Sequence, residues 1–262
     1  MHLSLHIERT GGTSLLAEYE AYYGPEKILV YSVLTNKLVR VSDLLVSPAN
    51  KSLSKLKAFV ENTPVLSFFY HLYTSVLDNF TNVVPWYELN NIPDDIAVIH
   101  GHFPPEYFAE ILPHSFTSVV LREPLERMIS QYLHWQRAGG DMGFRIEIPY
   151  DPEMSFKDYA FQKEFHNFQT RALGNMTLEE FDLVGITSQL DRFVARLKGE
   201  PSKASNKAAQ VNYMGHKPKH KELGITPQFI EKFKDINIED YNNYHKAMTL
   251  GEKGVSFPAG KV

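Results

Sequence analysis

The chain contains no cysteine among its 262 residues. This absence excludes disulfides, thiolate chemistry and cysteine-bearing zinc sites, and it favours a reducing compartment. Long apolar runs are missing as well, since no stretch of about 18 consecutive apolar residues occurs. The first motif begins almost at Met1, so we expect neither a signal peptide nor a membrane anchor. We therefore expect a cytoplasmic protein.

The chain also carries little net charge. Its 27 Lys and Arg residues against 31 Asp and Glu residues give a formal net charge of -4. Such a balance provides no global attraction to nucleic acid or to an anionic membrane, so we expect neither as a partner. Any anion site must then be local. The hydrophobic content of 43% is ordinary for a globular protein, and we interpret residues 1–262 as a single domain with one sizeable core.

The most informative segment is residues 3–16, LSLHIERTGGTSLL. A short apolar run, a glycine turn and a resumed apolar pattern predict a strand, a loop and the start of a helix. Gly11 and Gly12 allow a tight turn whose N–H groups come close to a bound anion. Thr13 and Ser14 are expected to cap the helix and to add hydroxyl donors. The segment therefore predicts an anion-binding loop at a helix N-terminus.

The loop differs from the Walker type that holds nucleoside triphosphates. A Walker loop has a glycine five residues before Gly-Lys-Ser/Thr, with the lysine on the outer phosphates and the hydroxyl on magnesium. Here Gly12 is followed by Thr13, and position 7 is Ile. The cationic residue is instead Arg9, ahead of the glycines, where a guanidinium could reach a leaving group. We therefore expect a less charged group that is transferred without a metal.

Two further motifs follow expected strands. Residues 117–121, TSVVL, predict a buried strand, and Arg122-Glu123-Pro124 leads into a segment with the apolar spacing of a helix. Arg127 and His134 share a helical face with Ser130 and are either part of a site or ordinary solvated residues.

His100-Gly101-His102 follows the apolar run 96–99. In parallel α/β sheets ligands bind beyond the carboxyl ends of strands, and we expect both histidines there. A neutral imidazole suits a general base at neutral pH. Both histidines could instead be structural residues of the core.

These motifs carry a family resemblance. The run HIERTGGTSL resembles the 5′-phosphosulfate loop of sulfotransferases that use 3′-phosphoadenosine-5′-phosphosulfate (PAPS), whose usual pattern is Pro-Lys-Thr-Gly-Gly/Thr-Thr-Ser. Glu8-Arg9 stands in place of Pro-Lys, which exchanges a point charge for a planar fork. The resemblance implies that the 5′ end of the nucleotide is bound by Arg9, Thr10, Gly11, Gly12, Thr13 and Ser14, with Arg9 also catalytic.

The other motifs extend the resemblance. Arg122 and Ser130, eight positions apart, correspond to the arginine and serine of the family's 3′-phosphate site. His100-Gly101-His102 is similar to the His-Gly-His of uronyl 2-O-sulfotransferases, in which a histidine takes the acceptor proton. His102 is the favoured base, and His100 positions it or shares the role.

Two later segments are also similar to the family, so that the resemblance spans roughly residues 3–247. Residues 181–197 resemble its late strand and helix, and residues 238–244 its C-terminal helix. The resemblance implies a three-layer, P-loop-like α/β fold with a mainly parallel central sheet flanked by helices. We expect a helical insert over 54–80 and a loop with a helix over 138–170 on the acceptor side. The helical pattern there runs from Phe156 to Leu173. A basic loop over 199–222 is expected to close over the nucleotide.

The function implied is transfer of the sulfuryl group from PAPS to a hydroxyl or amine of a glycan or small-molecule acceptor. The product nucleotide would be 3′,5′-ADP (PAP), and no metal would be required. A P-loop kinase or nucleotide hydrolase is one alternative, and a non-catalytic nucleotide- or glycan-binding module is another. The sequence leaves open whether the protein is a monomer or a homodimer.

Overall fold

The structure is a computed structural model that describes residues 1–32, 37–42, 84–85, 92–140, 148–200 and 220–252. The expected insert over 54–80 lies outside these residues. So does most of the expected basic loop over 199–222.

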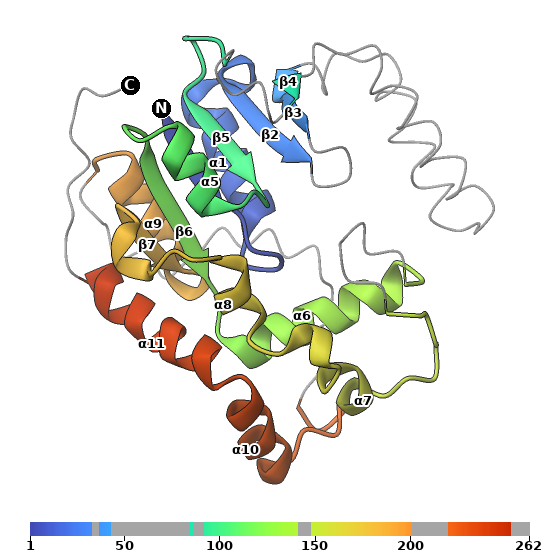
Figure 1. The fold of residues 1–262 in the computed structure, drawn as a ribbon. Helices are drawn as coiled ribbons and strands as arrows, with labels where there is room; N and C mark the ends of the chain where they lie inside the picture. The colour runs from blue at the N-terminus through green and yellow to red at the C-terminus, as the bar shows by residue number, and fades with distance from the viewer. Residues whose placement is uncertain (33–36, 43–83, 86–91, 141–147, 201–219, 253–262) are drawn as a thin grey trace.

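Seven strands form one sheet in the order β4-β3-β2-β5-β1-β6-β7 (Figure 1). The strands β2, β5, β1, β6 and β7 run parallel to one another, whereas β3 is antiparallel to β2 and to β4. The mainly parallel central sheet that the sequence predicts is thus confirmed. The strands are β1 (His2–Leu5), β2 (Ile28–Ser32), β3 (Lys37–Arg40), β4 (Val84–Pro85), β5 (Val98–Gly101), β6 (Phe116–Leu121) and β7 (Leu183–Ile186).

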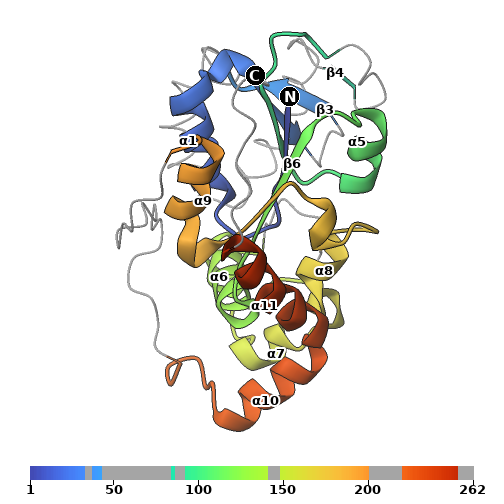
Figure 2. The ribbon, with the colours of Figure 1, turned by 90° about the vertical axis from the view of Figure 1, so that its left-hand side faces the viewer.

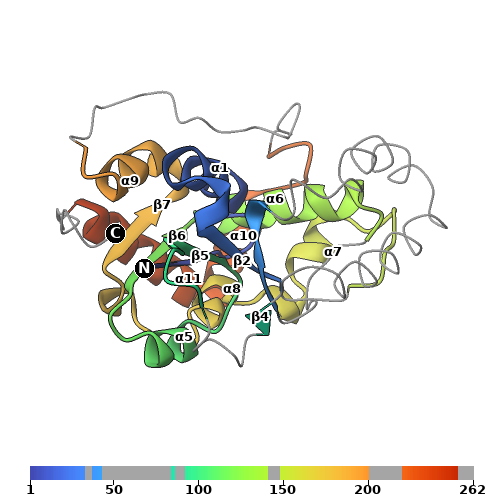
Figure 3. The same cartoon turned by 90° about the horizontal axis from the view of Figure 1, so that it is seen from above.

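Helices cover both faces of the sheet and make the fold a three-layer α/β structure. Figures 2 and 3 show α1 and α9 on one face and α5, α8 and part of α11 on the other. The α-helices are α1 (Gly12–Tyr23), α5 (Pro105–Ile111), α6 (Pro124–Arg137), α7 (Phe156–Ala160), α8 (Phe168–Ala172), α9 (Leu190–Leu197), α10 (Pro227–Ile236) and α11 (Ile238–Glu252). Short 3-10 helices are η1 (Pro25–Lys27), η3 (Lys163–Phe165), η4 (Leu178–Glu180) and η5 (Thr187–Gln189).

Alternation along the central strand separates an apolar face from a polar one. Leu3 and Leu5 pack in the cluster that includes α5 and α11. His2 and Ser4 point to the opposite face, where the Ser4 hydroxyl lies 2.9 Å from the Tyr19 hydroxyl of α1. The layer between the sheet and α1 therefore contains buried polar groups.

These polar groups are paired along neighbouring strands. His2 Nε2 lies 2.7 Å from the hydroxyl of Ser118 on β6, and Ser4 Oγ lies 2.9 Å from Nδ1 of His100 on β5. Burial lowers the pKa of His2 and of His100 to about 3. Both imidazoles are consequently neutral at neutral pH.

A second, aromatic lobe is built beyond the carboxyl edge of the sheet. Helices α6, α7, α10 and the start of α11 meet there around side chains such as Trp135, Tyr159 and Phe233. Helix α6 begins where β6 ends and runs into this lobe (Figure 1). It therefore connects the sheet edge to the lobe.

The helix expected from Phe156 to Leu173 is broken into α7, η3 and α8. Asn167 has a left-handed backbone with φ 46°, which interrupts the helix. The carboxylate of Asp240 accepts hydrogen bonds from the N–H groups of Gln169 and Thr170 at 3.1 and 2.7 Å. Because a distant side chain caps α8, local spacing alone does not reveal this break.

Candidate active site

The loop between β1 and α1 leaves backbone donors at a helix start. Gly11 is the N-cap residue, in the left-handed region with φ 100°. The first helical hydrogen bond runs from the Leu15 N–H to the Gly11 carbonyl at 3.0 Å. The N–H groups of residues 12–14 come before that bond, so they have no carbonyl partner within the helix. The first turn contains no acidic residue. No carboxylate of the helix itself therefore neutralises the positive end of the helix dipole, which faces this loop.

The expectation that Thr13 and Ser14 cap α1 is wrong. The N-cap position is occupied by Gly11, and no side chain caps the helix there. The left-handed glycine starts the helix at Gly12, so Thr13 and Ser14 fall within its first turn. Thr13 is exposed and Ser14 is half-buried. Both residues remain beside the free N–H groups.

Thr10 has a structural part in the loop. Its side chain is buried, and its hydroxyl donates to the Ile7 carbonyl at 2.8 Å. The hydroxyl of Thr187, which follows β7, lies 2.8 Å from the Thr10 carbonyl and 3.2 Å from the Leu121 carbonyl. Thr187 thus fastens the loop to the end of β6. Sequence reasoning did not single out Thr187, although the segment around it was noted.

The structure brings together three predicted site residues from distant parts of the chain. Arg9 Nε donates to the Ser130 hydroxyl at 3.2 Å, across 121 residues of sequence. Arg122 Nη1 donates to the carbonyl of Arg9 at 3.1 Å, across 113 residues. The glycine loop and the start of α6 therefore meet at one place.

The backbone of Arg122 is held by a buried glutamine. Gln169 Oε1 accepts from the Arg122 N–H at 2.9 Å, and Gln169 Nε2 donates to the Arg122 carbonyl at 2.8 Å. Gln169 is fully buried and belongs to α8, which Asp240 of α11 caps. Helix α11 therefore fixes α8, and α8 fixes the end of β6. Nothing in the local sequence marks Gln169 for this role.

Positive charge is concentrated around the loop. The pKa of Arg9 is lowered to about 10 by burial and then by Arg122, Arg137 and Arg127. Burial also lowers the pKa of Arg122 and of Arg127. The Glu126 carboxylate lies 3.8 Å from Arg122 and offsets part of this charge. A bound anion would relieve the remaining repulsion between the guanidinium groups.

Arg127 is a buried residue of α6. Its exposed fraction is only 2%, and its guanidinium carbon lies 4.3 Å from the ring centroid of Phe168. Its Nη1 has no hydrogen-bond partner among the described residues. Asp240 is the main charge that raises its pKa against the effect of burial. Of the two interpretations of Arg127, the solvated residue is therefore excluded.

The two histidines of the His-Gly-His motif occupy different environments. His102 has a side chain that is 21% exposed, and its Nδ1 makes a hydrogen bond to the His6 carbonyl. His100 is 2% exposed and is enclosed beside Ser4. Burial and the nearby His102 lower the pKa of His100 to about 3. The geometry thus favours His102 over His100 as a group that meets an acceptor.

His6 belongs to the same cluster, although sequence reasoning missed it. Its ring centroid lies 4.3 Å from that of His102 and 5.1 Å from that of His100. A Cβ atom on residue 12 would lie 1.9 Å from Nε2 of His6. Gly12 is therefore required to make room for this imidazole. The only sequence signal was the position of His6 directly before the loop.

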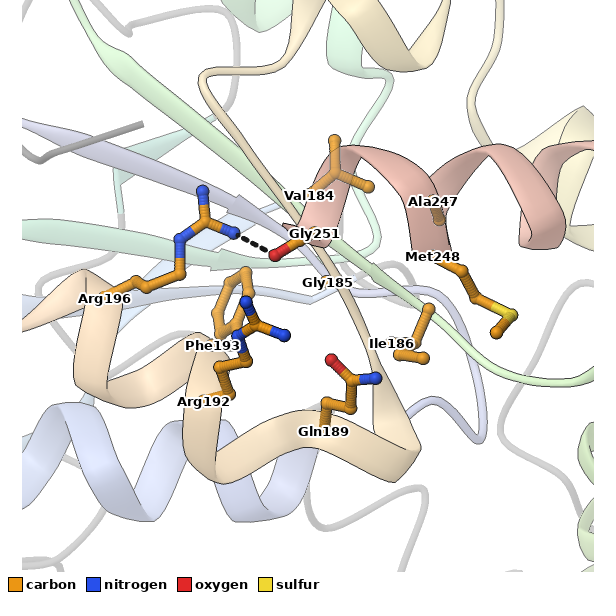
Figure 4. A pocket seen from close by; sticks show the side chains of 10 residues that line it. All are labelled: Val184, Gly185, Ile186, Gln189, Arg192, Phe193, Arg196, Ala247, Met248 and Gly251. Carbon is orange, nitrogen blue, oxygen red and sulfur yellow. Dashed lines mark hydrogen bonds between the residues drawn. The ribbon is translucent and has the colours of Figure 1, made fainter. Parts of the chain in front are cut away.

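A pocket lies at the edge of the sheet, between β7, α9 and α11 (Figure 4). It is small and partly open to solvent, with room for about one water molecule. Arg192, Arg196 and Gln189 surround it, and Arg196 donates to the Gly251 carbonyl at 2.9 Å. None of the predicted site residues lines this pocket.

Comparisons of the chain with protein-family models, with curated proteins and with solved structures give no match. Within the described ranges, no group of three or more His, Cys, Asp or Glu side chains is arranged to hold a metal ion. Nor does the described part of the chain contain a helix of the length and apolarity needed to cross a membrane. The chemistry of the site must therefore be inferred from its own residues.

Proposed function

We propose that the protein is a sulfotransferase that moves the sulfuryl group of PAPS to a hydroxyl or amine of a glycan or small-molecule acceptor. The observation that carries this proposal is the meeting of Arg9, Arg122 and Ser130 at the glycine loop. Two elements that are separate in sequence, each with donor groups suited to an anion, lie side by side there. This arrangement suits a ligand with anionic groups at two positions.

The residues present fit such a nucleotide. The N–H groups of residues 12–14 and the guanidinium of Arg9 would hold the 5′-phosphosulfate. Arg122 and Ser130 would hold the 3′-phosphate, with the guanidinium as a two-pronged donor. The lowered pKa of Arg9 supports the assignment, because like charges gathered in a partly buried place are stabilised by a bound anion.

PAPS supplies the sulfuryl group: a bond forms from the acceptor oxygen or nitrogen to sulfur while the sulfur bond to the 5′-phosphate oxygen breaks, and PAP leaves with that electron pair. His102 takes the proton of the acceptor. Arg9 and the loop N–H groups stabilise the negative charge that grows on the leaving oxygen. As in phosphoryl transfer, the protein acts mainly through positioning and electrostatics.

Isothermal titration calorimetry with PAP tests the nucleotide assignment. We expect PAP to bind the wild-type protein and to bind more tightly than 5′-ADP, because only PAP places a phosphate on Arg122 and Ser130. Equal affinities for the two nucleotides would contradict the assignment. Hydrolysis of ATP with magnesium would instead support the kinase or hydrolase alternative. PAP binding without sulfuryl transfer to any of a panel of acceptors would select the non-catalytic module.

A further inference from the structure

The protonation of the His102 ring follows from its hydrogen-bond partner. Nδ1 of His102 contacts the carbonyl oxygen of His6. A carbonyl oxygen can only accept, so Nδ1 carries the hydrogen and donates it. The other ring nitrogen, Nε2, then keeps its lone pair. In this neutral form, His102 takes up a proton through Nε2.

A carboxylate lies next to the donating side of the ring. Oε1 of Glu8 is 3.8 Å from Nδ1 of His102, and the Glu8 side chain is only 14% exposed. Glu8 is therefore a charged neighbour of the same N–H, at ion-pair distance and not at hydrogen-bond distance. When Nε2 gains a proton and the ring becomes a cation, Glu8 supplies a negative charge at ion-pair distance.

The three other loop and strand residues that the site places with this ring are His6, His100 and Arg9, and none of them carries a negative charge. His6 and His100 lie on one side of it, and burial lowers the pKa of both. Arg9 follows Glu8 in the loop, and Arg127 is close enough for Glu8 to raise its pKa. An imidazolium at His102 would add positive charge to a group of arginines, so the Glu8 carboxylate is the compensating partner in the loop.

We propose that Glu8 is a positioning residue for His102, one that keeps Nδ1–H directed at the loop and offsets the imidazolium formed when Nε2 takes the acceptor proton. The His6 carbonyl then determines the tautomer, and the Glu8 carboxylate, 3.8 Å from Nδ1, supplies the negative charge. The proposed sulfotransferase function is the premise for the proton coming from a sulfuryl acceptor. The residue that departs from the Pro-Lys pattern thereby gains a role in proton transfer.

A double-mutant cycle tests the coupling of the two residues. Glu8→Gln should lower kcat about ten- to a hundredfold, by analogy with the loss seen when a carboxylate that orients a metal-bound histidine is removed, and should leave the PAP affinity unchanged. In a His102→Ala background the same substitution should cause no further loss, because the ring that Glu8 serves is gone. Glu110→Gln removes a carboxylate from the exposed surface of α5 and should leave kcat at the wild-type value.

Wild-type turnover in Glu8→Gln would overturn the proposal, as would an equal loss of kcat in both backgrounds. A second measurement does not depend on turnover. In protein labelled with ¹⁵N-histidine at pH 8, the ring resonances that disappear in His102→Ala should show a protonated Nδ1 and a bare Nε2. Glu8→Gln should keep this tautomer, which the His6 carbonyl holds, but should move the Nδ1–H resonance, because a charged neighbour is replaced by a neutral amide.

The two measurements separate this proposal from the proposed function. A wild-type protein that transfers no sulfuryl group would contradict the proposed function. The nuclear magnetic resonance spectra would then still test, by themselves, whether Glu8 acts on the His102 ring. A protonated Nε2 in the wild type, or identical spectra for the wild type and Glu8→Gln, would overturn the proposal that Glu8 positions His102.

Discussion

Arg9 combines two roles in the loop. Its carbonyl accepts from Arg122, and its side chain donates to Ser130. Its backbone lies in the left-handed region with φ 68°, which is uncommon for a residue other than glycine. The loop therefore holds a guanidinium in a defined place before any ligand binds, and such preorganisation is what stabilises charge in a transition state.

For the proposed sulfuryl transfer, replacing Arg9 by alanine should lower turnover about 10²- to 10³-fold, the usual effect of removing one preorganised donor from a developing charge. The measurement is kcat with saturating PAPS and any acceptor that the wild type uses. Arg192→Ala is the matched control, because Arg192 is an arginine of the separate pocket. Full turnover in Arg9→Ala would show that the guanidinium does not act on the leaving group.

At the residue scale, the sequence predicted the groups that belong to short motifs and missed those that act across the fold. Arg9 follows from its place beside the glycine loop, and Arg122 and Ser130 follow from the family resemblance; the structure brings the three together, and their binding roles stay predictions. Gln169 and Thr187 could not, because their partners are 47 and up to 177 residues away. Hydrogen bonds over such separations leave no periodic or compositional signal.

At the scale of elements, α8 and α11 cap each other. Asp240 of α11 accepts from the N–H groups at the start of α8, and the side chain of Asn167, which precedes α8, accepts from the N–H groups of Glu239 and Asp240 at 3.2 and 3.3 Å. The two helix starts are thus satisfied by side chains from each other's segment. Because Gln169 holds Arg122, this reciprocal cap also determines where the β6 end lies.

Asp240→Ala should destabilise the protein by about 1–3 kcal/mol, because it leaves buried N–H groups without an acceptor. The loss should be larger if Arg127, which Asp240 stabilises electrostatically, is left as an uncompensated buried charge. Urea denaturation measures the free energy of unfolding. Glu239→Ala, one residue earlier at an exposed position, keeps its backbone N–H and should change stability by less than about 0.5 kcal/mol. Equal stability of the two variants would contradict the capping role of Asp240.

Local sequence patterns are sufficient to predict some helices and strands and not others. Apolar runs ending at glycine, histidine or arginine predicted β1, β5 and β6, and Pro124 marked the start of α6. Local spacing predicts one helix from Phe156 to Leu173, and this prediction is wrong. The break in the helix depends on Asp240 and on the left-handed backbone of Asn167. The hydrogen bonds from α8 to Asp240 therefore outweigh the local helical spacing of this stretch.

At the scale of the whole molecule, the buried histidines couple folding to pH. Folding lowers the pKa of His2 and of His100 from 6.5 to about 3. The unfolded chain therefore binds protons below pH 6.5 that the folded chain does not bind. Stability is fully present above that pH and is lost as the pH falls towards 3, by about 1.4 kcal/mol per pH unit for each histidine.

His2→Gln should consequently reduce the slope of unfolding free energy against pH, between pH 6 and pH 4, by about 1.4 kcal/mol per unit. Urea denaturation at a series of pH values gives this slope, which is independent of any uniform loss of stability in the variant. His245→Gln alters an exposed histidine of α11 and should leave the slope unchanged. Parallel curves for the wild type and His2→Gln would show that His2 is not held neutral in the folded protein.

The placement of β1 has a consequence for biosynthesis. This strand is synthesised before its two partners, because it lies in the interior of the sheet and pairs with β5 and β6, which follow it in the chain. Asp240, which fixes α8, is translated later still. A nascent chain must therefore carry β1 without its partner strands until β5 and β6 have emerged, and Arg122 can meet the glycine loop only after β6 has been made.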